Sequence, residues 1–101
     1  LTSIPPKEEK LISIMVMIEK GFFIAFDISK ILVNHHIKHD LNFHNNIKKG
    51  LKYSNKIDAS MAIIIGETEV QNNNFKIKNL ATGKQDEINI ESLLRYLNIN
   101  E

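Results

Sequence analysis

Four histidines are the side chains of this sequence that could do chemistry as a group. They lie within residues 35–44, and they are His35, His36, His39 and His44. A spacing of four residues, as between His35 and His39, can place two imidazoles on one helix face for a zinc ion. The helical periodicity described below ends near Ile37, however, so the four rings would not converge. We interpret them as polar residues at a junction between a helix and a strand, and we predict no metal site.

The rest of the sequence has no pattern typical of an active site. The four glycines of the chain are too far apart to form a phosphate-binding loop. No serine lies in a nucleophile elbow, and the single arginine, Arg95, cannot supply the several guanidinium groups that phosphate-transfer sites use. We therefore expect no catalytic residue. The absence of cysteine fits a reducing compartment, and we expect a cytoplasmic protein.

Positive charge is concentrated in the middle third of the chain. The net charge of all 101 residues is only +1, so no overall field attracts nucleic acid. Residues 35–56, however, contain five lysines and one aspartate. Lys48, Lys52 and Lys56 recur at four-residue intervals, with Lys49 beside them. This pattern indicates a basic surface on one helix, and the alternative is a plain solvent-exposed helix face.

Two kinds of apolar pattern predict the strands that must hold these residues. Residues 11–18 and 61–65 are continuous apolar runs rich in Ile and Val, typical of strands covered on both faces. Residues 39–44 and 75–80 alternate polar and apolar residues, which predicts strands with one buried face. Residues 86–90 can pair back as an antiparallel strand after a turn at Thr82-Gly83.

Helical spacing predicts three helices between and after these strands. The first covers residues 21–37, with Ile24, Ile28 and Leu32 on its apolar side. The second begins after a cap at Asn45 or Asn46 and covers residues 47–57. The last begins near residue 89 or 90. The resulting order predicts an α/β fold: a three-layer α/β/α sandwich with a five-stranded mixed sheet and right-handed crossovers.

The length of the chain allows one domain. Pro5-Pro6 and the charged residues after them predict a linker over residues 1–9, followed by the domain over residues 10–101. The longest apolar run is too short to cross a membrane. Because the chain opens with Leu1 and has charges before that run, we expect a piece of a longer protein without a signal peptide.

Three motifs follow one another from residue 47 onward. A lysine-rich helix contains Leu51-Lys52-Tyr53, the buried strand ends in Gly66-Glu67-x-Glu69, and a hairpin carries Lys78-x-Leu80-x-Thr82-Gly83-x-Gln85. Over this half of the chain the sequence resembles the C-terminal anticodon-binding domain of the histidyl-tRNA synthetases, which are class II aminoacyl-tRNA synthetases. The threonyl, prolyl and glycyl enzymes share the fold and a looser Gly-x-x-Glu, and they stay open as alternatives. The Thr-Gly-x-Gln ending is similar to the histidine branch.

The resemblance implies a function and a set of partners. It implies that the domain reads the anticodon loop of tRNA-His for a parent enzyme that attaches histidine to this tRNA with ATP and Mg²⁺. No cofactor is implied in the domain itself. The implied protein partner is the catalytic domain of the parent, which we expect to be a homodimer, whereas we expect the isolated domain to be a monomer. No membrane contact is implied.

The resemblance also implies the residues of the site, because in the family's fold the corresponding loops gather at one end of the sheet. The expected anticodon contacts are Glu67, Glu69, Lys78, Asn79, Thr82 and Gln85. A carboxylate can accept two N–H groups from a guanine edge, and an amide offers a donor and an acceptor to uracil. The expected contacts to the RNA backbone are Lys48, Lys49 and Lys52. The alternative for the two glutamates is a solvated loop or a helix cap, and for Lys78 an exposed strand side chain.

Some positions depart from the family, and two other functions stay open. His36 and Asp58 stand where the family prefers glycine, so we expect both to take a left-handed backbone, which His and Asp tolerate. The family's Leu-Arg pair is Leu32-Val33 here, so any contact of that arginine is lost. The other functions are a protein-interaction module without RNA reading and a small-ligand binder at the strand ends.

Overall fold

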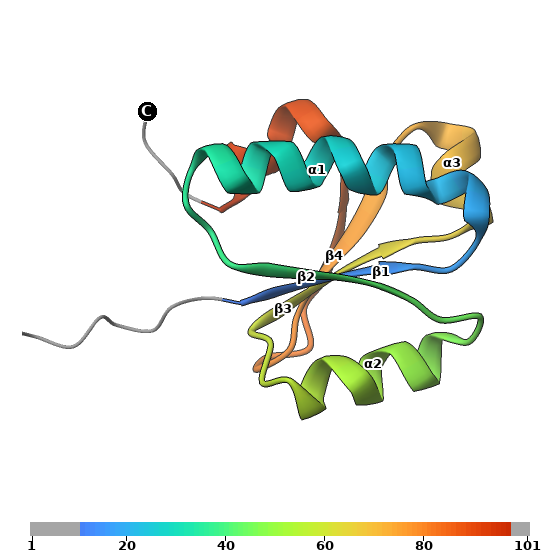
Figure 1. The fold of residues 1–101 in the computed structure, drawn as a ribbon, viewed down its shortest axis with the longest axis vertical. Coiled ribbons are helices and arrows are strands. Elements are labelled where there is room, and N and C mark those ends of the chain that lie inside the picture. The colour runs from blue at the N-terminus through green and yellow to red at the C-terminus, as the bar shows by residue number, and fades with distance from the viewer. Residues whose placement is uncertain (1–10, 98–101) are drawn as a thin grey trace, which may run out of the picture.

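A central five-stranded sheet organises the computed structural model, which describes residues 11–97 (Figure 1). The strands are β1 (Ile12–Val16), β2 (His39–Phe43), β3 (Met61–Ile65), β4 (Phe75–Asn79) and β5 (Gln85–Ile88). Their order in the sheet is β2-β1-β3-β4-β5. β1 is parallel to β2 and β3, whereas β4 and β5 form an antiparallel hairpin beside β3. The expected linker over residues 1–9 lies outside the described residues.

Helices cover both faces of this sheet. The helices are α1 (Phe22–Asn34), α2 (Ile47–Lys56), α3 (Glu67–Asn72) and α4 (Leu93–Tyr96), with 3-10 turns at Glu19–Gly21 and Ile90–Ser92. In Figure 1, α1 and α3 lie on one side of the sheet and α2 lies on the other. The predicted three-layer α/β/α sandwich with a five-stranded mixed sheet is confirmed. None of the helices within residues 11–97 is long and apolar enough to span a membrane.

Each face of the sheet has its own apolar core. On the α1 side, the alternate residues of the central strands pack with Ile28, Leu32 and Leu93. On the α2 side, a smaller core is built on Met15, Ala62 and Ile64, and Leu51 of α2 packs against it. Gly50 lies close to the sheet, where a Cβ would meet the end of the Met15 side chain. The continuous apolar runs are therefore the central strands, as predicted.

Three helices end in the same hydrogen-bonded turn, which requires a left-handed residue after the helix. At the end of α1, the Ile37 N–H donates to the Leu32 carbonyl over 2.8 Å, and His36 between them has a φ of 57°. The equivalent residue after α2 is Asp58, with a φ of 65°, and after α3 it is Asn73, with a φ of 58°. The left-handed backbone predicted for His36 and Asp58 is confirmed.

Two parts of the sequence-based prediction are wrong. The helix predicted over residues 21–37 begins instead with a 3-10 turn and ends at Asn34, because the turn at His36 closes it. The helix α3 is not among the predicted helices, although a helix cap was one alternative for Glu67 and Glu69. It has only 6 residues, too few to show a periodic pattern. The predicted cap of α2 is confirmed at Asn46, whose side chain accepts the Lys49 N–H over 3.1 Å.

Candidate nucleic-acid interface

The six residues expected to contact the anticodon do not gather at one end of the sheet. Glu67 and Glu69 follow the carboxyl end of β3. β4 is antiparallel to β3, with Met61 opposite Asn79, so Lys78 and Asn79 lie at the amino end of β3. Gln85 lies opposite Lys78 at that same end. The expectation that all six residues gather at one end of the sheet is therefore wrong. The chain reverses between β3 and β4, which carries the Gly66-Glu67-x-Glu69 motif and the hairpin motif to opposite ends.

One face of the β4–β5 hairpin nevertheless connects the two motifs. Lys76 and Lys78 alternate along β4, and their partners across the hairpin are Glu87 and Gln85. The two lysines also lie opposite Ile64 and Ala62 of β3, which belong to the core on the α2 side. Gln85 and Glu87 are exposed and the two lysines are half-buried. We call these four residues, Lys76, Lys78, Gln85 and Glu87, the open strip.

Glu69 is built into the scaffold at one end of the open strip. The residue is only 4% exposed. Its Oε1 accepts the Gly66 N–H over 2.7 Å, which caps α3, and its Oε2 pairs with the Lys76 ammonium. Burial raises the pKa of Glu69, but the hydrogen bonds from Lys76 and Gly66 and the Lys76 charge outweigh it, so this pKa lies below its ordinary value.

The geometry of Glu69 corrects its expected role. A buried carboxylate with both oxygens engaged does not present an edge to a nucleobase, so the helix-cap alternative describes it. Glu67, two residues earlier, is exposed on the first turn of α3. Among the described residues 11–97, its carboxylate accepts only a long hydrogen bond of 3.4 Å from Gln71. Glu67 therefore keeps an accessible acceptor.

Asn79 and Thr82 shape the turn of the hairpin. The Asn79 Oδ1 accepts the backbone N–H groups of Ala81 and Thr82 over 2.9 and 3.0 Å. The Thr82 Oγ1 in turn accepts the Lys84 N–H over 3.2 Å. A φ of 82° at Gly83 completes the reversal of the chain. These contacts fix the positions of the strand ends that carry Lys78 and Gln85.

Lys78 and Gln85 are the two members of the open strip with uncommitted polar groups. Within the part of the chain that the structure describes, neither side chain makes a hydrogen bond or an ion pair. By contrast, Lys76 pairs with Glu69, and Glu87 accepts a hydrogen bond of 3.1 Å from Asn74. An ammonium and an amide therefore stand side by side on a rigid hairpin, and they can bind an external polar group.

The lysines of α2 surround its outer surface. Lys48, Lys49 and Lys52 are all exposed. Leu51 packs toward β3, whereas the Tyr53 hydroxyl donates to Asp40 of β2 over 2.9 Å. Because successive helical residues are about 100° apart, Lys48 lies closer to the side of Leu51 than to the side of Tyr53. Lys52 points outward, and Lys49 lies on the β2 side. Along the helix, Lys48 lies near the carboxyl end of β2, whereas Lys52 lies nearer to the amino end of β3, where Lys78 and Gln85 stand.

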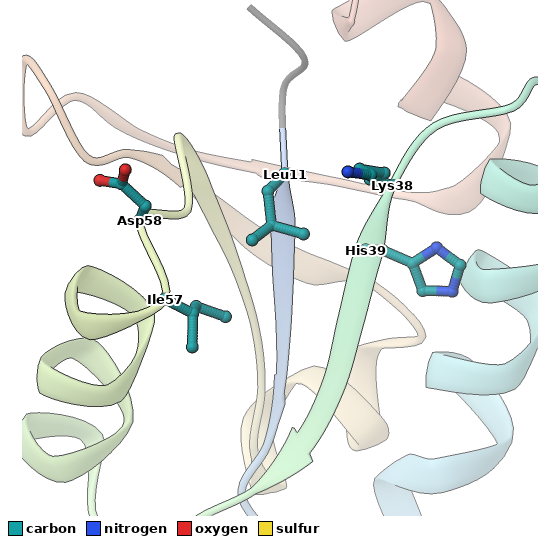
Figure 2. A pocket seen from close by; sticks show the side chains of 5 residues that line it. All are labelled: Leu11, Lys38, His39, Ile57 and Asp58. Atoms are coloured by element: carbon teal, nitrogen blue, oxygen red, sulfur yellow. The ribbon is translucent and has the colours of Figure 1, made fainter.

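The histidines and the hollow shown in Figure 2 lie elsewhere. The ring of His39 bonds the Ser29 hydroxyl over 2.7 Å and the Ile37 carbonyl over 3.2 Å, and the ring of His44 packs on Tyr53. Among residues 11–97, no three His, Asp or Glu side chains are placed to hold a metal ion. Figure 2 shows a hollow of about 420 Å³ lined by Leu11, Lys38, His39, Ile57 and Asp58. It lies at the amino ends of the parallel strands, whereas ligands of open α/β sheets bind at the carboxyl ends.

Comparison with known proteins identifies relatives of the whole domain. A family model described as an anticodon binding domain matches residues 10–99. The histidine–tRNA ligase of Clostridium novyi is 34% identical over 91 residues, which are 89% of this chain and 22% of that protein. The crystal structure of the S. aureus histidyl-tRNA synthetase superposes with a TM-score of 0.74 at 30% identity, over 88% of this chain and 23% of that one.

The fold extends to a second branch of relatives. The RNA binding domain of the threonyl-tRNA synthetase from Cryptosporidium parvum superposes with a TM-score of 0.77 at 15% identity, over 89% of this chain. At that identity the likeness concerns the fold alone. The chain spans about a fifth of the length of the relatives it matches.

Proposed function

This chain belongs to the anticodon-binding domain family, and from that membership we propose that it reads the anticodon of tRNA-His as one domain of a histidine–tRNA ligase. The observation that carries the proposal is the uncommitted pair of Lys78 and Gln85 on the open strip. Proteins read RNA sequence mainly on unpaired bases, through hydrogen bonds to the base edges. An anticodon presents three such bases.

The chemistry of the pair suits a base edge. The Gln85 amide has a donor and an acceptor, which match the acceptor and donor of a uracil edge, and the Lys78 ammonium can donate to a base carbonyl or a phosphate. The exposed Glu67 is the remaining carboxylate that could accept from a guanine. Asn79 and Thr82 act by shaping the hairpin, and Glu69 acts by holding Lys76. In this proposal Glu69 is a positioning residue.

The lysines of α2 supply the contacts that do not depend on sequence. Lys48 lies on the first turn of α2, and Lys52 lies one turn nearer to the amino end of β3, where Lys78 and Gln85 stand. A loop bound on that pair would therefore bring its phosphates closer to Lys52 than to Lys48. Such contacts orient the RNA without distinguishing its bases. Lys49 lies farther from the strip and would meet the RNA only where the stem continues past α2.

The chemistry of aminoacylation belongs to the remainder of the ligase. We assign ATP, Mg²⁺ and the attachment of histidine to the catalytic domain, and dimerisation to the parent enzyme. Residues 11–97 offer no cluster of three metal-ligating side chains and only one arginine, Arg95. This assignment implies a cytoplasmic protein of translation.

Titration with RNA tests the proposal. The 101-residue chain is titrated with a tRNA-His transcript and with transcripts that carry changed anticodon bases or the anticodons of tRNA-Thr, tRNA-Pro and tRNA-Gly. We expect tRNA-His to bind most tightly. Lys78→Ala and Gln85→Ala should each weaken it about tenfold, equivalent to about 1.4 kcal/mol, and reduce the discrimination between transcripts.

Two results would overturn the proposal. Equal affinity for tRNA-His and for the transcripts with changed anticodons would show that the chain does not recognise the anticodon sequence. A preference for one of the other three anticodons would indicate that the chain belongs to the threonyl, prolyl or glycyl branch of the family. Asn34→Ala is the control for Gln85, because Asn34 is an exposed amide at the end of α1, away from the open strip and from Glu67.

A further inference from the structure

Tyr96 and Asp86 form a polar contact on the face of β5 that turns away from the open strip. The Tyr96 hydroxyl of α4 donates to the Asp86 Oδ2 over 2.7 Å. Asp86 lies opposite Ile77 of β4, which is fully buried in the core on the α1 side. Asp86 itself is half-buried, and Ile88 two residues later packs against that same core. A carboxylate thus stands where the alternation of β5 would place an apolar side chain.

Tyr96 is held beside β5 by local contacts. α4 has only 4 residues, and its first residue, Leu93, is fully buried in the core. The Asn89 side chain caps the 3-10 turn before α4, because it accepts the Ser92 N–H over 3.1 Å. The hydrogen bond to Asp86 raises the pKa of the Tyr96 hydroxyl above its ordinary value. The hydroxyl therefore keeps its proton near neutral pH and remains a donor to β5.

The position of β5 depends on this contact, because β5 is an edge strand. Among the described strands it pairs only with β4. Apolar packing is not directional, so the contact of Ile88 with the core does not define the rotation of the strand. A hydrogen bond requires a defined distance and angle. The contact between Tyr96 and Asp86 therefore fixes β5 relative to the core one residue away from Gln85.

Gln85 lies on the opposite face of β5 from Asp86. Successive side chains of a strand point to opposite faces, so holding Asp86 on the α1 side directs Gln85 to the other side, where Lys78 lies. Gln85 is exposed, and among residues 11–97 its side chain makes no hydrogen bond or ion pair. The direction of the Gln85 amide therefore depends on the backbone of β5, which Asp86 anchors.

We propose that the hydrogen bond between Tyr96 and Asp86 is a positioning contact for base recognition, because it sets the direction in which Gln85 presents its amide to an unpaired base. The inference rests on the proposed function, since it requires that Gln85 contacts RNA. Recognition of a base edge needs an amide donor and acceptor that are aligned together. The overall attraction to RNA depends on charge. A rotation of β5 should therefore weaken the recognition of one base more than the binding of RNA in general.

Single changes in the anticodon test the proposal. The 101-residue chain, Gln85→Ala and Tyr96→Phe are each titrated with tRNA-His transcripts that carry one changed anticodon base. Discrimination is the ratio of the affinities for the unchanged and the changed transcript, and the base at which Gln85→Ala loses it is the base that Gln85 reads. We expect Tyr96→Phe to lose about threefold in discrimination at that same base, within the range of coupling between contacting residues. Discrimination at the other two bases should stay unchanged.

Further variants separate positioning from a general loss of stability. The double variant Gln85→Ala/Tyr96→Phe should discriminate as Gln85→Ala does, because Tyr96 acts through Gln85. Asp86→Asn keeps an acceptor for the tyrosine hydroxyl, so it should retain the discrimination that Asp86→Ala loses. The negative charge that both Asp86 variants remove should change the affinity for all transcripts alike.

The second tyrosine of the sequence provides the matched control. The Tyr53 hydroxyl of α2 also donates to an aspartate, which is Asp40 of β2, over 2.9 Å. β2 and β5 are the two edge strands of the sheet. Tyr53→Phe thus removes the same kind of contact at the opposite edge. We expect it to leave the discrimination at all three anticodon bases unchanged.

Four outcomes would overturn the proposal. They are unchanged discrimination in Tyr96→Phe, equal weakening of all transcripts by Tyr96→Phe, unchanged discrimination in Gln85→Ala, and a further loss when Tyr96→Phe is added to Gln85→Ala. The second would assign the hydroxyl to stability alone, and the fourth would assign it to a contact separate from Gln85. If the unsubstituted chain binds all transcripts equally, the proposed function fails as well. Discrimination that is present in that chain and survives Tyr96→Phe overturns this inference alone.

Discussion

At the scale of single residues, two glutamates that look equivalent in the sequence have different environments. Glu67 and Glu69 both follow the buried strand β3, and both were expected to contact bases. The helix α3 turns Glu69 back toward the sheet, where it meets Gly66 and Lys76, and leaves Glu67 in solvent. The sequence contained one signal of this difference: a glutamate three residues after Gly66 is the spacing at which a side chain caps the start of a helix.

The first prediction concerns the stability that Glu69 provides. Glu69→Gln removes the charge that pairs with Lys76 and weakens the cap on Gly66. We expect it to lower the free energy of unfolding by about 1–3 kcal/mol, as for other partly buried charged hydrogen bonds. Glu67→Gln, the matched control on the same helical turn, should change stability by less than about 0.5 kcal/mol. Urea denaturation at pH 7 measures both, and equal effects would contradict the assigned role.

The same carboxylate gives stability a defined pH dependence. Because the folded-state pKa of Glu69 is lowered, its contribution is complete above the unfolded value of about 4.3 and is lost as the pH falls through the lower folded value. The difference in unfolding free energy between the original chain and Glu69→Gln should therefore shrink below about pH 4. A difference that stays constant down to pH 3 would show that the charge plays no part.

At the scale of elements, the ends of the helices contain strained residues. His36 and Asp58 occupy left-handed positions that cost a residue with a Cβ about 1–2 kcal/mol. Asp58 has a second disadvantage, since it places a negative charge at the carboxyl end of α2, where the helix dipole is also negative.

We predict that Asp58→Gly stabilises the domain by about 1 kcal/mol, because relief of strain and charge exceeds the entropy that glycine adds to the unfolded chain. Asp58→Ala should not stabilise, because alanine removes the charge but keeps the Cβ. Asp58→Asn separates the two causes, since asparagine tolerates the left-handed backbone and is neutral. Thermal and urea unfolding of the three variants measure the effect, and a gain in Asp58→Ala equal to that in Asp58→Gly would assign it to charge alone.

The elements also show how far the sequence determines the fold. The strands β1 and β3 were predictable because they are continuous apolar runs, and α1 and α2 because their apolar residues recur at helical spacing. α3 was missed because 6 residues give no period, so the only local signal was the spacing between Gly66 and Glu69 that caps the helix. The separation of Glu67 from Lys78 depends on the direction of β4 relative to β3, a property that side-chain patterns alone do not encode.

At the scale of the whole molecule, the sheet separates two surfaces of different chemistry. The open strip lies on the β4–β5 hairpin, and the stacked rings of Phe22 and Phe43 lie at the free edge of β2. The net charge of +1 hides this arrangement, because the five lysines of residues 35–56 are balanced by acidic residues elsewhere. A binding surface for RNA on this chain must therefore be a local patch of positive charge, and the effect of removing a lysine must depend on where that lysine lies.

The last prediction follows from that locality. If Lys48 contacts a phosphate of bound tRNA, Lys48→Ala should lower the slope of log affinity against log salt by about one unit and weaken all transcripts alike. Lys30→Ala is the control, because Lys30 is an exposed lysine on α1, in the opposite helical layer. This substitution removes the same charge. Both variants change the net charge equally, so a general field would alter both slopes. A slope that falls only for Lys48→Ala would place the RNA backbone on the α2 side. Equal slopes for the two variants would show that the lysine face of α2 is solvent-exposed and does not contact RNA.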